Sequence, residues 1–519
     1  MKRSRSAAAF SPDDMRAEDN GANSVVVEPD EAHARSLAAM TDAAGVSSSE
    51  PHVSPVVLVG LVRLIEFILL CATAELVHLL YVVPHDGYDP AYLIAIPSIA
   101  AFAIVMFQIF NVNNVAAFRS PVTQGFRVAC AWTVVVLAML AVVFFLKADA
   151  TFSRVWMIGT YGLGLAALLL ERGLLMLVTL RLTRSGRLDR RTVIVGGGSA
   201  GATLLRDLAK QKDTDIRICG VFDDRNDDRS PSEVAGYPKL GNVDDLVAVA
   251  RHTRIDLIIF TLPITAEQRL LQMLRKLWVL PIDIRLSAHM NKLKLRPRSY
   301  SYIGSVPVLD VFDKPIADWD VVIKSIFDRV VAALAVALLS PVLALTALAV
   351  KLDSKGPVLF KQRRYGFNNE LIEVYKFRSM YTDAMDHTAS KLVTRGDPRV
   401  TRVSRFIRRT SIDELPQLFN VLLKGNLSLV GPRPHAVHAK AADRQYDVVV
   451  DGYFARHRVR PGITGWAQVN GWRGETDTPD KIQHRVEHDL AYIENWSLFF
   501  DLYILLITPF ALFKTDNAY

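Results

Sequence analysis

Long apolar blocks follow a polar start in the first third of the chain. The blocks at residues 91–110 and 128–146 carry no charged residue. Each approaches the ~20 residues that a membrane-spanning helix needs. The blocks at 56–83 and 155–180 are at least as long but contain ionisable side chains. We therefore expect a bundle of four transmembrane helices within residues 55–182.

The charged residues inside these blocks have two interpretations. They line a polar pathway through the bundle, or they pair with one another or lie near a helix end. We favour the second interpretation. The residues are Arg63, Glu66, Glu75 and His78 in the first block, and Glu171 and Arg172 in the fourth.

Residues 191–288 change to short β-rich runs that alternate with helical stretches. The runs RTVIV, IRICGVF, DLIIFTL and PIDIRLS predict about four strands, with helical patterns between them. This alternation is typical of a parallel α/β sheet. We expect a Rossmann-like domain over residues 189–312, with fewer strands than a full dinucleotide-binding fold.

A glycine-rich loop follows the first of these strands. Gly196, Gly198 and Gly201 fit the pattern G-x-G-x-x-G directly before a helical stretch, and Asp223 ends the second strand. Amide groups at such a helix start can hold a phosphate, and the acidic residue can bind a ribose hydroxyl. The domain either binds a nucleotide through these residues or is a structural or regulatory remnant.

A fifth apolar block, at 325–350, differs from the first four. It is uncharged from Val330 to Val350, yet basic residues flank it on both sides, whereas a true span is expected to be asymmetric. Ser340 and Pro341 lie at its centre, where proline breaks the helical hydrogen-bond pattern. We expect a re-entrant helix that enters and leaves on one face. A proline-kinked span is the alternative.

Basic residues in the loops predict the orientation. Five arginines follow the fourth block in RLTRSGRLDRR, whereas the loop PHDGYDP has no lysine or arginine. The positive-inside rule then places the amino terminus and everything after residue 181 in the cytoplasm. Residues 1–54 hold few large apolar residues and are expected to form a disordered cytoplasmic tail.

Composition agrees with a membrane protein of several parts. Half of the 519 residues are hydrophobic, and the mean hydropathy is +0.20. These values exclude a wholly disordered chain and disfavour a uniformly soluble one. Three cysteines exclude a disulfide framework. The net charge is +8, and much of the excess of basic over acidic residues lies after residue 355.

The basic stretch RVTRVSRFIRRTSIDELPQLFNVL contains adjacent carboxylates, Asp413 and Glu414. Its arginines recur at helical spacing, which suits anionic lipid or a phosphorylated ligand. Nucleic acid is disfavoured, because membrane segments flank the region. A carboxylate can attack phosphorus, and its neighbour can bind a metal. An Asp-Glu pair alone, however, is usually solvated surface.

The surrounding motifs make the pair specific. SIDELPQLFNVLLKGNLSLVGPRP, KFRSM, the Ser-Pro break and PGITGWAQVNG together resemble the bacterial sugar transferase family. These enzymes are polyprenyl-phosphate sugar-1-phosphate transferases. The resemblance covers residues 319–519, and the upstream spans and α/β domain resemble its large-form members. The ending RGETDTP…NAY is similar to the subgroup of undecaprenyl-phosphate glucose phosphotransferases.

The resemblance implies a fold, a reaction and a set of site residues. The last region would be an α-rich, monotopic phosphoglycosyl transferase domain with a re-entrant helix. Asp413 matches the nucleophile, and Glu414 matches a carboxylate that helps to hold Mg²⁺. Ser340 and Pro341 match the helix break. The basic residues expected near phosphate or nucleotide are Lys376, Arg378, Arg408 and Arg433.

The implied reaction moves glucose-1-phosphate from UDP-glucose to undecaprenyl phosphate through a phospho-aspartyl intermediate. It would begin exopolysaccharide or capsule synthesis on the cytoplasmic face of the bacterial inner membrane, in contact with its lipid. Two points stay open. The reaction is the same if galactose-1-phosphate is transferred or if the donor is another UDP-hexose, and the protein is a monomer or a homodimer. Two other classes remain: an NAD-dependent membrane sugar-nucleotide dehydratase and a nucleotide-sensing membrane receptor. The dehydratase would need a Tyr-x-x-x-Lys pair, which the chain lacks.

Overall fold

The computed structural model describes most of the chain from residue 53 to residue 513. The predicted tail therefore lies almost wholly outside the described residues. Within this range the structure does not describe residues 111, 114–117, 119–120, 146, 148–150, 212–214, 226–230, 263–266, 288–300, 304–305, 382–398, 436–439, 442–443, 446–449, 451 and 473–477.

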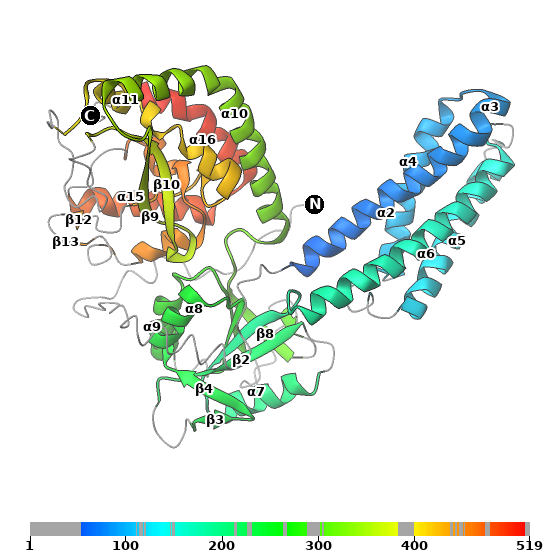
Figure 1. Ribbon diagram of the computed structural model, residues 1–519. Helices are drawn as coiled ribbons and strands as arrows, with labels where there is room; N and C mark the ends of the chain where they lie inside the picture. The colour runs from blue at the N-terminus through cyan, green and yellow to red at the C-terminus, as the bar shows by residue number, and fades with distance from the viewer. Residues whose placement is uncertain are drawn as a thin grey trace. The chain divides into compact units, whose positions relative to one another are not determined.

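The chain divides into two compact units, and the boundary along the sequence falls between residues 190 and 191. The apolar unit consists of helices that are long and apolar enough to cross a membrane (Figure 1). The first helix packs against the second and the fourth, and the third packs against the same two. The helices are α2 (Pro55–Val77), continued by η2 (His78–Val82) and α3 (Val83–Asp86), then α4 (Ala91–Ile109), α5 (Pro121–Phe145) and α6 (Arg154–Arg184).

An ion pair joins two of these helices inside the bundle. Glu66 on α2 forms a salt bridge with Arg172 on α6, and both side chains are buried. Asn113 donates to Glu66 at 2.8 Å and accepts from Arg172 at 3.0 Å. The favoured interpretation, pairing, is therefore confirmed for these two charges.

The second unit begins with an α/β domain built on one eight-stranded sheet. The strand order is β3-β4-β2-β1-β5-β6-β8-β7. The central pairs β2–β4, β1–β5 and β5–β6 are parallel, whereas β3, β7 and β8 pair in antiparallel fashion. The strands are β1 (Arg190–Val195), β2 (Ile216–Phe222), β3 (Glu233–Val234), β4 (Tyr237–Gly241), β5 (Leu257–Phe260), β6 (Asp283–Ser287), β7 (Ser301–Ile303) and β8 (Val306–Phe312).

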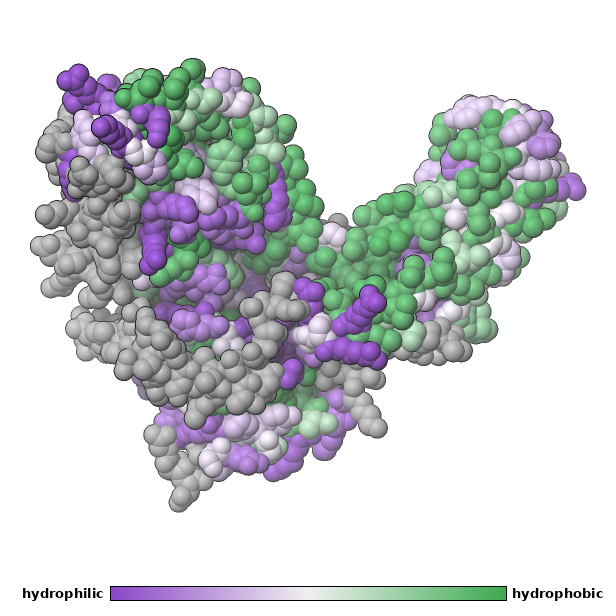
Figure 2. Space-filling model, in the orientation of Figure 1, coloured by the Kyte–Doolittle hydropathy of each residue, from purple (hydrophilic) through white to green (hydrophobic). Residues whose placement is uncertain are grey.

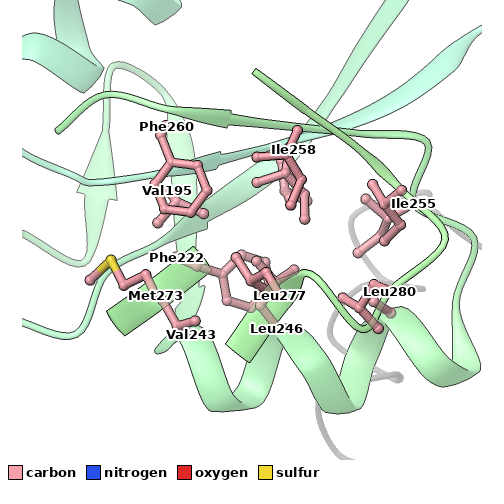
Figure 3. Packing of buried hydrophobic residues seen from close by; sticks show 14 of the residues in the cluster. Val195, Phe222, Val243, Leu246, Ile255, Ile258, Phe260, Met273, Leu277 and Leu280 are labelled. Carbon is pink, nitrogen blue, oxygen red and sulfur yellow. The ribbon is translucent and has the colours of Figure 1, made fainter. Parts of the chain in front are cut away.

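Helices cover both faces of this sheet. On one face lies α7 (Ser199–Ala209), whose leucines pack against Ile194 and Val221. On the other face lie α8 (Val243–His252) and α9 (Glu267–Leu277). Figure 3 shows Leu246 and Leu277 packed beneath Phe222 and Ile258 of the sheet. The expectation of about four strands was wrong, because β3 and β4 on one side of the predicted strands and β8 and β7 on the other side were not recognised as strands.

The remaining residues form a compact domain of helices and small sheets. It contains a β-hairpin, β9–β10, and a parallel pair, β11–β14. Its elements are α10 (Asp318–Asp353), β9 (Leu359–Tyr365), η7 (Phe367–Asn369), β10 (Leu371–Phe377), α11 (Arg402–Arg409), η9 (Ile412–Glu414), α12 (Gln417–Phe419), η10 (Asn420–Lys424), β11 (Ser428–Val430), β12 (Lys440–Ala441), β13 (Arg444–Gln445), η11 (Tyr453–Arg458), β14 (Gly462–Thr464), α14 (Trp466–Val469), α15 (Pro479–Glu494) and α16 (Leu498–Phe513).

Helix α10 runs without a break through Ser340 and Pro341, and it bends along its length (Figure 1). A straight helix of 36 residues would be about 54 Å long. Both parts of α10 instead pack on the same domain. Lys324, near the start, pairs with Asp501 of α16 at 2.6 Å. Arg378, which follows β10, donates to the carbonyl of Ser354 at the other end at 2.7 Å.

The outward surface of α10 is apolar. Leu338 is 81% exposed and Leu345 is 68% exposed. Phe499 and Phe510 on α16 are likewise exposed. Figure 2 shows hydrophobic residues along α10. Water-exposed apolar surface of this extent marks an interaction site, and its length suits a lipid bilayer.

Candidate active site

Asp413 and Glu414 lie on the short 3₁₀ turn η9, between α11 and α12. Ser411 ends α11 with a left-handed φ of 58°, which reverses the chain before the carboxylates. The amide of Glu414 then bonds the carbonyl of Ser411 at 3.2 Å. Pro416 follows as the N-cap of α12 and fixes the exit from the turn. The local sequence TSIDELP therefore holds two carboxylates on one tight turn.

Two cations hold Glu414. Its Oε1 accepts a hydrogen bond from Nζ of Lys376 on β10 at 2.8 Å and from Nη2 of Arg433 at 2.6 Å. Arg433 follows β11 in the sequence GPRP. Burial opposes the charge of Glu414, but Arg433 and Lys376 outweigh it and hold the pKa of the carboxyl well below its usual range. Glu414 is therefore ionised at neutral pH.

Asp413 has the opposite tendency. Burial raises the pKa of its carboxyl to about 6, and the adjacent Glu414 acts in the same direction. The charges of Lys376, Arg408 and Arg433 limit this rise. Adjacent carboxylates whose pKa values are pushed apart are suited to different roles. Glu414 is firmly ionised and paired, whereas Asp413 is a more basic and therefore more nucleophilic carboxylate.

A small cleft opens to solvent beside Glu414 and Arg433. Arg364 on β9 also lines it, and burial lowers the pKa of this guanidinium to about 10, so it stays charged at neutral pH. The cleft is lined by Arg364, Val374, Glu414, Gln417, Arg433, Pro434, Gly462 and Ile463.

Sequence reasoning missed Arg364 and Gln417. In the β9–β10 hairpin, Arg364 pairs with Ile372, and Lys376 pairs with Phe360. Side chains alternate between the two faces of a strand, so Arg364 and Lys376 share a face. The alternation in LFKQRRY was a usable signal, but only with the hairpin register known.

Arg378 does not reach the cleft. Its side chain is 1% exposed, and its guanidinium donates to the carbonyls of Lys355 at 2.8 Å and Ser354 at 2.7 Å. It therefore satisfies carbonyl groups at the end of α10, as cations commonly do at a helix C-terminus. Phosphate binding is not supported for Arg378. Arg408, on α11, is close enough to Asp413 for its charge to lower that pKa.

The donor set at the dyad suits Mg²⁺ rather than a softer metal. Mg²⁺ is usually held by one or two carboxylates, water and substrate phosphates. Among the described residues, both hydrogen bonds of Glu414 go to Oε1, so Oε2 remains available as a ligand. No cluster of three His, Cys, Asp or Glu side chains occurs in the described parts of the chain. A magnesium ion would thus depend on phosphate oxygens of the substrate.

The glycine-rich loop of the α/β domain binds its own acidic residue. The amide of Gly197 donates to Oδ2 of Asp223 at 2.7 Å, and Arg225 pairs with the same carboxylate at 3.0 Å. Gly201 is required for packing, because a Cβ there would lie 2.2 Å from the carbonyl oxygen of Gly196. Gly198 caps α7. Asp223 thus occupies an amide that a phosphate would use.

Two family models match this chain. A family model described as bacterial sugar transferase matches residues 319–515, and one described as CoA-binding domain matches residues 108–288.

Three relatives extend the similarity. Undecaprenyl-phosphate glucose phosphotransferase of Komagataeibacter xylinus is 41% identical over 66% of this chain, which spans only 63% of that relative. UDP-glucose:undecaprenyl-phosphate glucose-1-phosphate transferase of Escherichia coli K12 is 37% identical over 75% of this chain and 81% of its own length. UDP-N-acetylgalactosamine-undecaprenyl-phosphate N-acetylgalactosaminephosphotransferase of Aeromonas hydrophila is 45% identical over 36% of this chain and 42% of its own. The chain belongs to the bacterial sugar transferase family.

Proposed function

We propose that this protein transfers glucose-1-phosphate from UDP-glucose to undecaprenyl phosphate, giving undecaprenyl-diphosphate-glucose and UMP. The observation that carries the proposal is the arrangement of the two carboxylates. Asp413 has a pKa raised to about 6, and Glu414 beside it is held by Lys376 and Arg433. A basic carboxylate within a cluster of cations suits attack on a phosphate group.

In the first step, an oxygen of Asp413 attacks the phosphorus that bears the sugar. The new bond joins this oxygen to phosphorus, and the bond from phosphorus to the UMP oxygen breaks. The electron pair leaves with UMP. Negative charge grows on the phosphoryl oxygens and the leaving oxygen, and the cations Lys376, Arg364 and Arg433 neutralise it. When bound, Mg²⁺ adds Lewis-acid stabilisation of the same oxygens.

In the second step, a phosphate oxygen of undecaprenyl phosphate attacks the phosphorus of the phospho-aspartyl group. The bond between phosphorus and Asp413 breaks, and the carboxylate is restored. Glu414 stays ionised throughout and keeps Lys376 and Arg433 in place. No proton transfer is required, because both nucleophiles are anions.

The bent helix α10 supports a location at the membrane surface. Both of its parts bind one domain, and its apolar outer residues include Leu338 and Leu345. A helix tied in this way would enter the bilayer and return without crossing. The active site would then lie at the cytoplasmic face of the inner membrane, where a lipid phosphate and a soluble nucleotide sugar can meet. Basic residues after α6 favour that face.

Glucose is the donor sugar that the relatives aligned across most of the chain support, because their names specify it. A relative named for N-acetylgalactosamine is 45% identical over a shorter stretch of 187 residues. Overall identity therefore does not decide the sugar. A donor panel of UDP-glucose, UDP-galactose and UDP-N-acetylhexosamines, with purified full-length protein, tests the assignment.

Isotope exchange between labelled UMP and UDP-glucose, without lipid acceptor, tests the two-step reaction. A phospho-aspartyl enzyme forms and reverses under these conditions, so label should enter UDP-glucose. Addition of undecaprenyl phosphate should then move labelled sugar into the organic phase. Transfer that occurs only with acceptor present, without exchange, would argue for direct displacement.

A further inference from the structure

A buried cluster of charged side chains lies behind the loop that carries Arg433. Arg456 on η11 has no exposed surface, and Asp489 on α15 is 2% exposed. Nη2 of Arg456 donates to Oδ2 of Asp489 at 2.6 Å and to the backbone carbonyl of Arg433 at 2.7 Å. One guanidinium group thus joins α15 to the main chain of an active-site residue.

The same guanidinium also contacts His435, two residues after Arg433 in this loop. Nη1 of Arg456 lies 2.6 Å from Nδ1 of His435. Burial, together with the charges of Arg456 and Arg485, holds the pKa of His435 well below its usual value. The ring is therefore neutral and can accept a hydrogen bond from Arg456. Arg456 binds the loop at residue 433 and again at residue 435.

We propose that Arg456, held by Asp489, is a positioning residue that fixes this loop so that the side chain of Arg433 meets Glu414. The inference rests on the proposed function. Arg456 acts through the main chain of Arg433. Its planar guanidinium contacts three acceptors at once, which are Oδ2 of Asp489, the backbone carbonyl of Arg433 and Nδ1 of His435. A lysine cannot reproduce that geometry, because its ammonium is a single point charge on a flexible stem.

Arg456→Lys in the full-length protein is the first test, because it keeps a positive charge opposite Asp489. We expect kcat for UMP exchange to fall by about 10- to 100-fold, the usual cost of losing a partner that orients a site residue. KM should change less. The variant's thermal unfolding gives its folded fraction. Arg285→Lys, an ion-paired arginine in the α/β domain, is the matched control.

The pH profile separates positioning from a merely structural role. Arg433 lowers the pKa of Asp413. If Arg456→Lys lets Arg433 move away, the acid limb of the exchange rate should shift to higher pH. The other charged groups around Asp413, which are Lys376, Arg364, Arg408 and Glu414, stay in place. A loss of folded protein alone would lower the rate at every pH by one factor.

A double variant, Arg456→Met with Asp489→Leu, keeps the proposal testable if the lysine variant folds poorly. It replaces both members of the buried pair by apolar side chains, and such replacements often preserve stability. We expect it to fold and to show the same lowered kcat. Folded variants with wild-type kcat and an unshifted acid limb would overturn the proposal. A wild-type protein with neither exchange nor transfer to undecaprenyl phosphate would instead overturn the proposed function itself.

Discussion

The guanidinium of Arg433 donates to Glu414 Oε1 at 2.6 Å and so joins two separate sequence motifs at one carboxylate. Lys376 brings a third motif to the same oxygen. Glu414 therefore organises the cations, while its neighbour Asp413 keeps a raised pKa. The four predictions below follow from this division of roles and from the way α10 is tied to its domain.

Replacement of Asp413 should remove the nucleophile without disturbing its surroundings. Asp413→Asn is nearly isosteric, so we expect a folded protein whose UMP exchange falls by at least about a thousandfold. Asp413→Glu should retain little activity, because the longer side chain displaces the attacking oxygen. Asp480→Asn, at the start of α15, is a matched control. Normal exchange by Asp413→Asn would exclude the covalent step.

Replacement of Arg433 should affect the rate through charge. Arg433→Gln removes one of the two cations on Glu414, and we expect a loss of about 10²- to 10³-fold in kcat, as for a lost oxyanion donor. Arg433→Lys should recover part of the rate, because a charge remains near the reacting phosphate. Steady-state exchange kinetics measure both. Equal rates for the two variants would show that charge at this position does not matter.

The exchange rate should depend on pH through Asp413. Only the ionised carboxylate attacks phosphorus, so the rate should be constant well above pH 6 and fall about tenfold for each pH unit below it. The measurement is initial exchange rate from pH 4.5 to pH 8 at saturating UDP-glucose. An acid limb centred near pH 4 would mean that Asp413 is not desolvated in the working enzyme.

Both ends of α10 should be accessible from the same side of the membrane. Val321 and Leu352 are exposed near its two ends. In a chain whose cysteines Cys71, Cys130 and Cys219 are replaced, Val321→Cys and Leu352→Cys should react with a membrane-impermeant thiol reagent in inverted vesicles.

Neither of these two cysteines should react in intact spheroplasts. Tyr88→Cys, in the loop before α4, provides the opposite control and should be labelled from outside. Labelling of the two α10 positions from opposite sides would mean that the helix crosses the membrane.

Local sequence predicted some of these features and not others, for physical reasons. The Asp-Glu pair was recognisable because the motifs around it resemble the bacterial sugar transferase family. The tight turn that carries it, with Ser411 and Pro416 at its two limits, was not predicted. Lys376 and Arg378 stand two positions apart in one motif, yet only Lys376 meets Glu414. Arg378 instead donates to backbone carbonyls within residues 350–355. The spacing of residues in the sequence does not predict contacts with backbone carbonyls.

The same limit applies to the α/β domain. The buried central strands were visible as apolar runs, whereas β3, with two residues, and β7, with three, were too short to show alternation. The glycine pattern correctly predicted a strand, a loop and a helix. It did not reveal that Asp223 would turn inward to Gly197 rather than face a ligand.

The two attachments of α10 have a consequence for how the protein is made. Its first part contributes Ala332 to the core around Val421 and Leu429, and its second part contributes Leu343 and Val350 to the core around Ile407. Neither core is complete until the helix has bent and both parts have docked. The outward residues at the bend are apolar and exposed. If α10 enters the bilayer as proposed, its insertion and the closure of the two catalytic cores are coupled, because the same bent helix takes part in both.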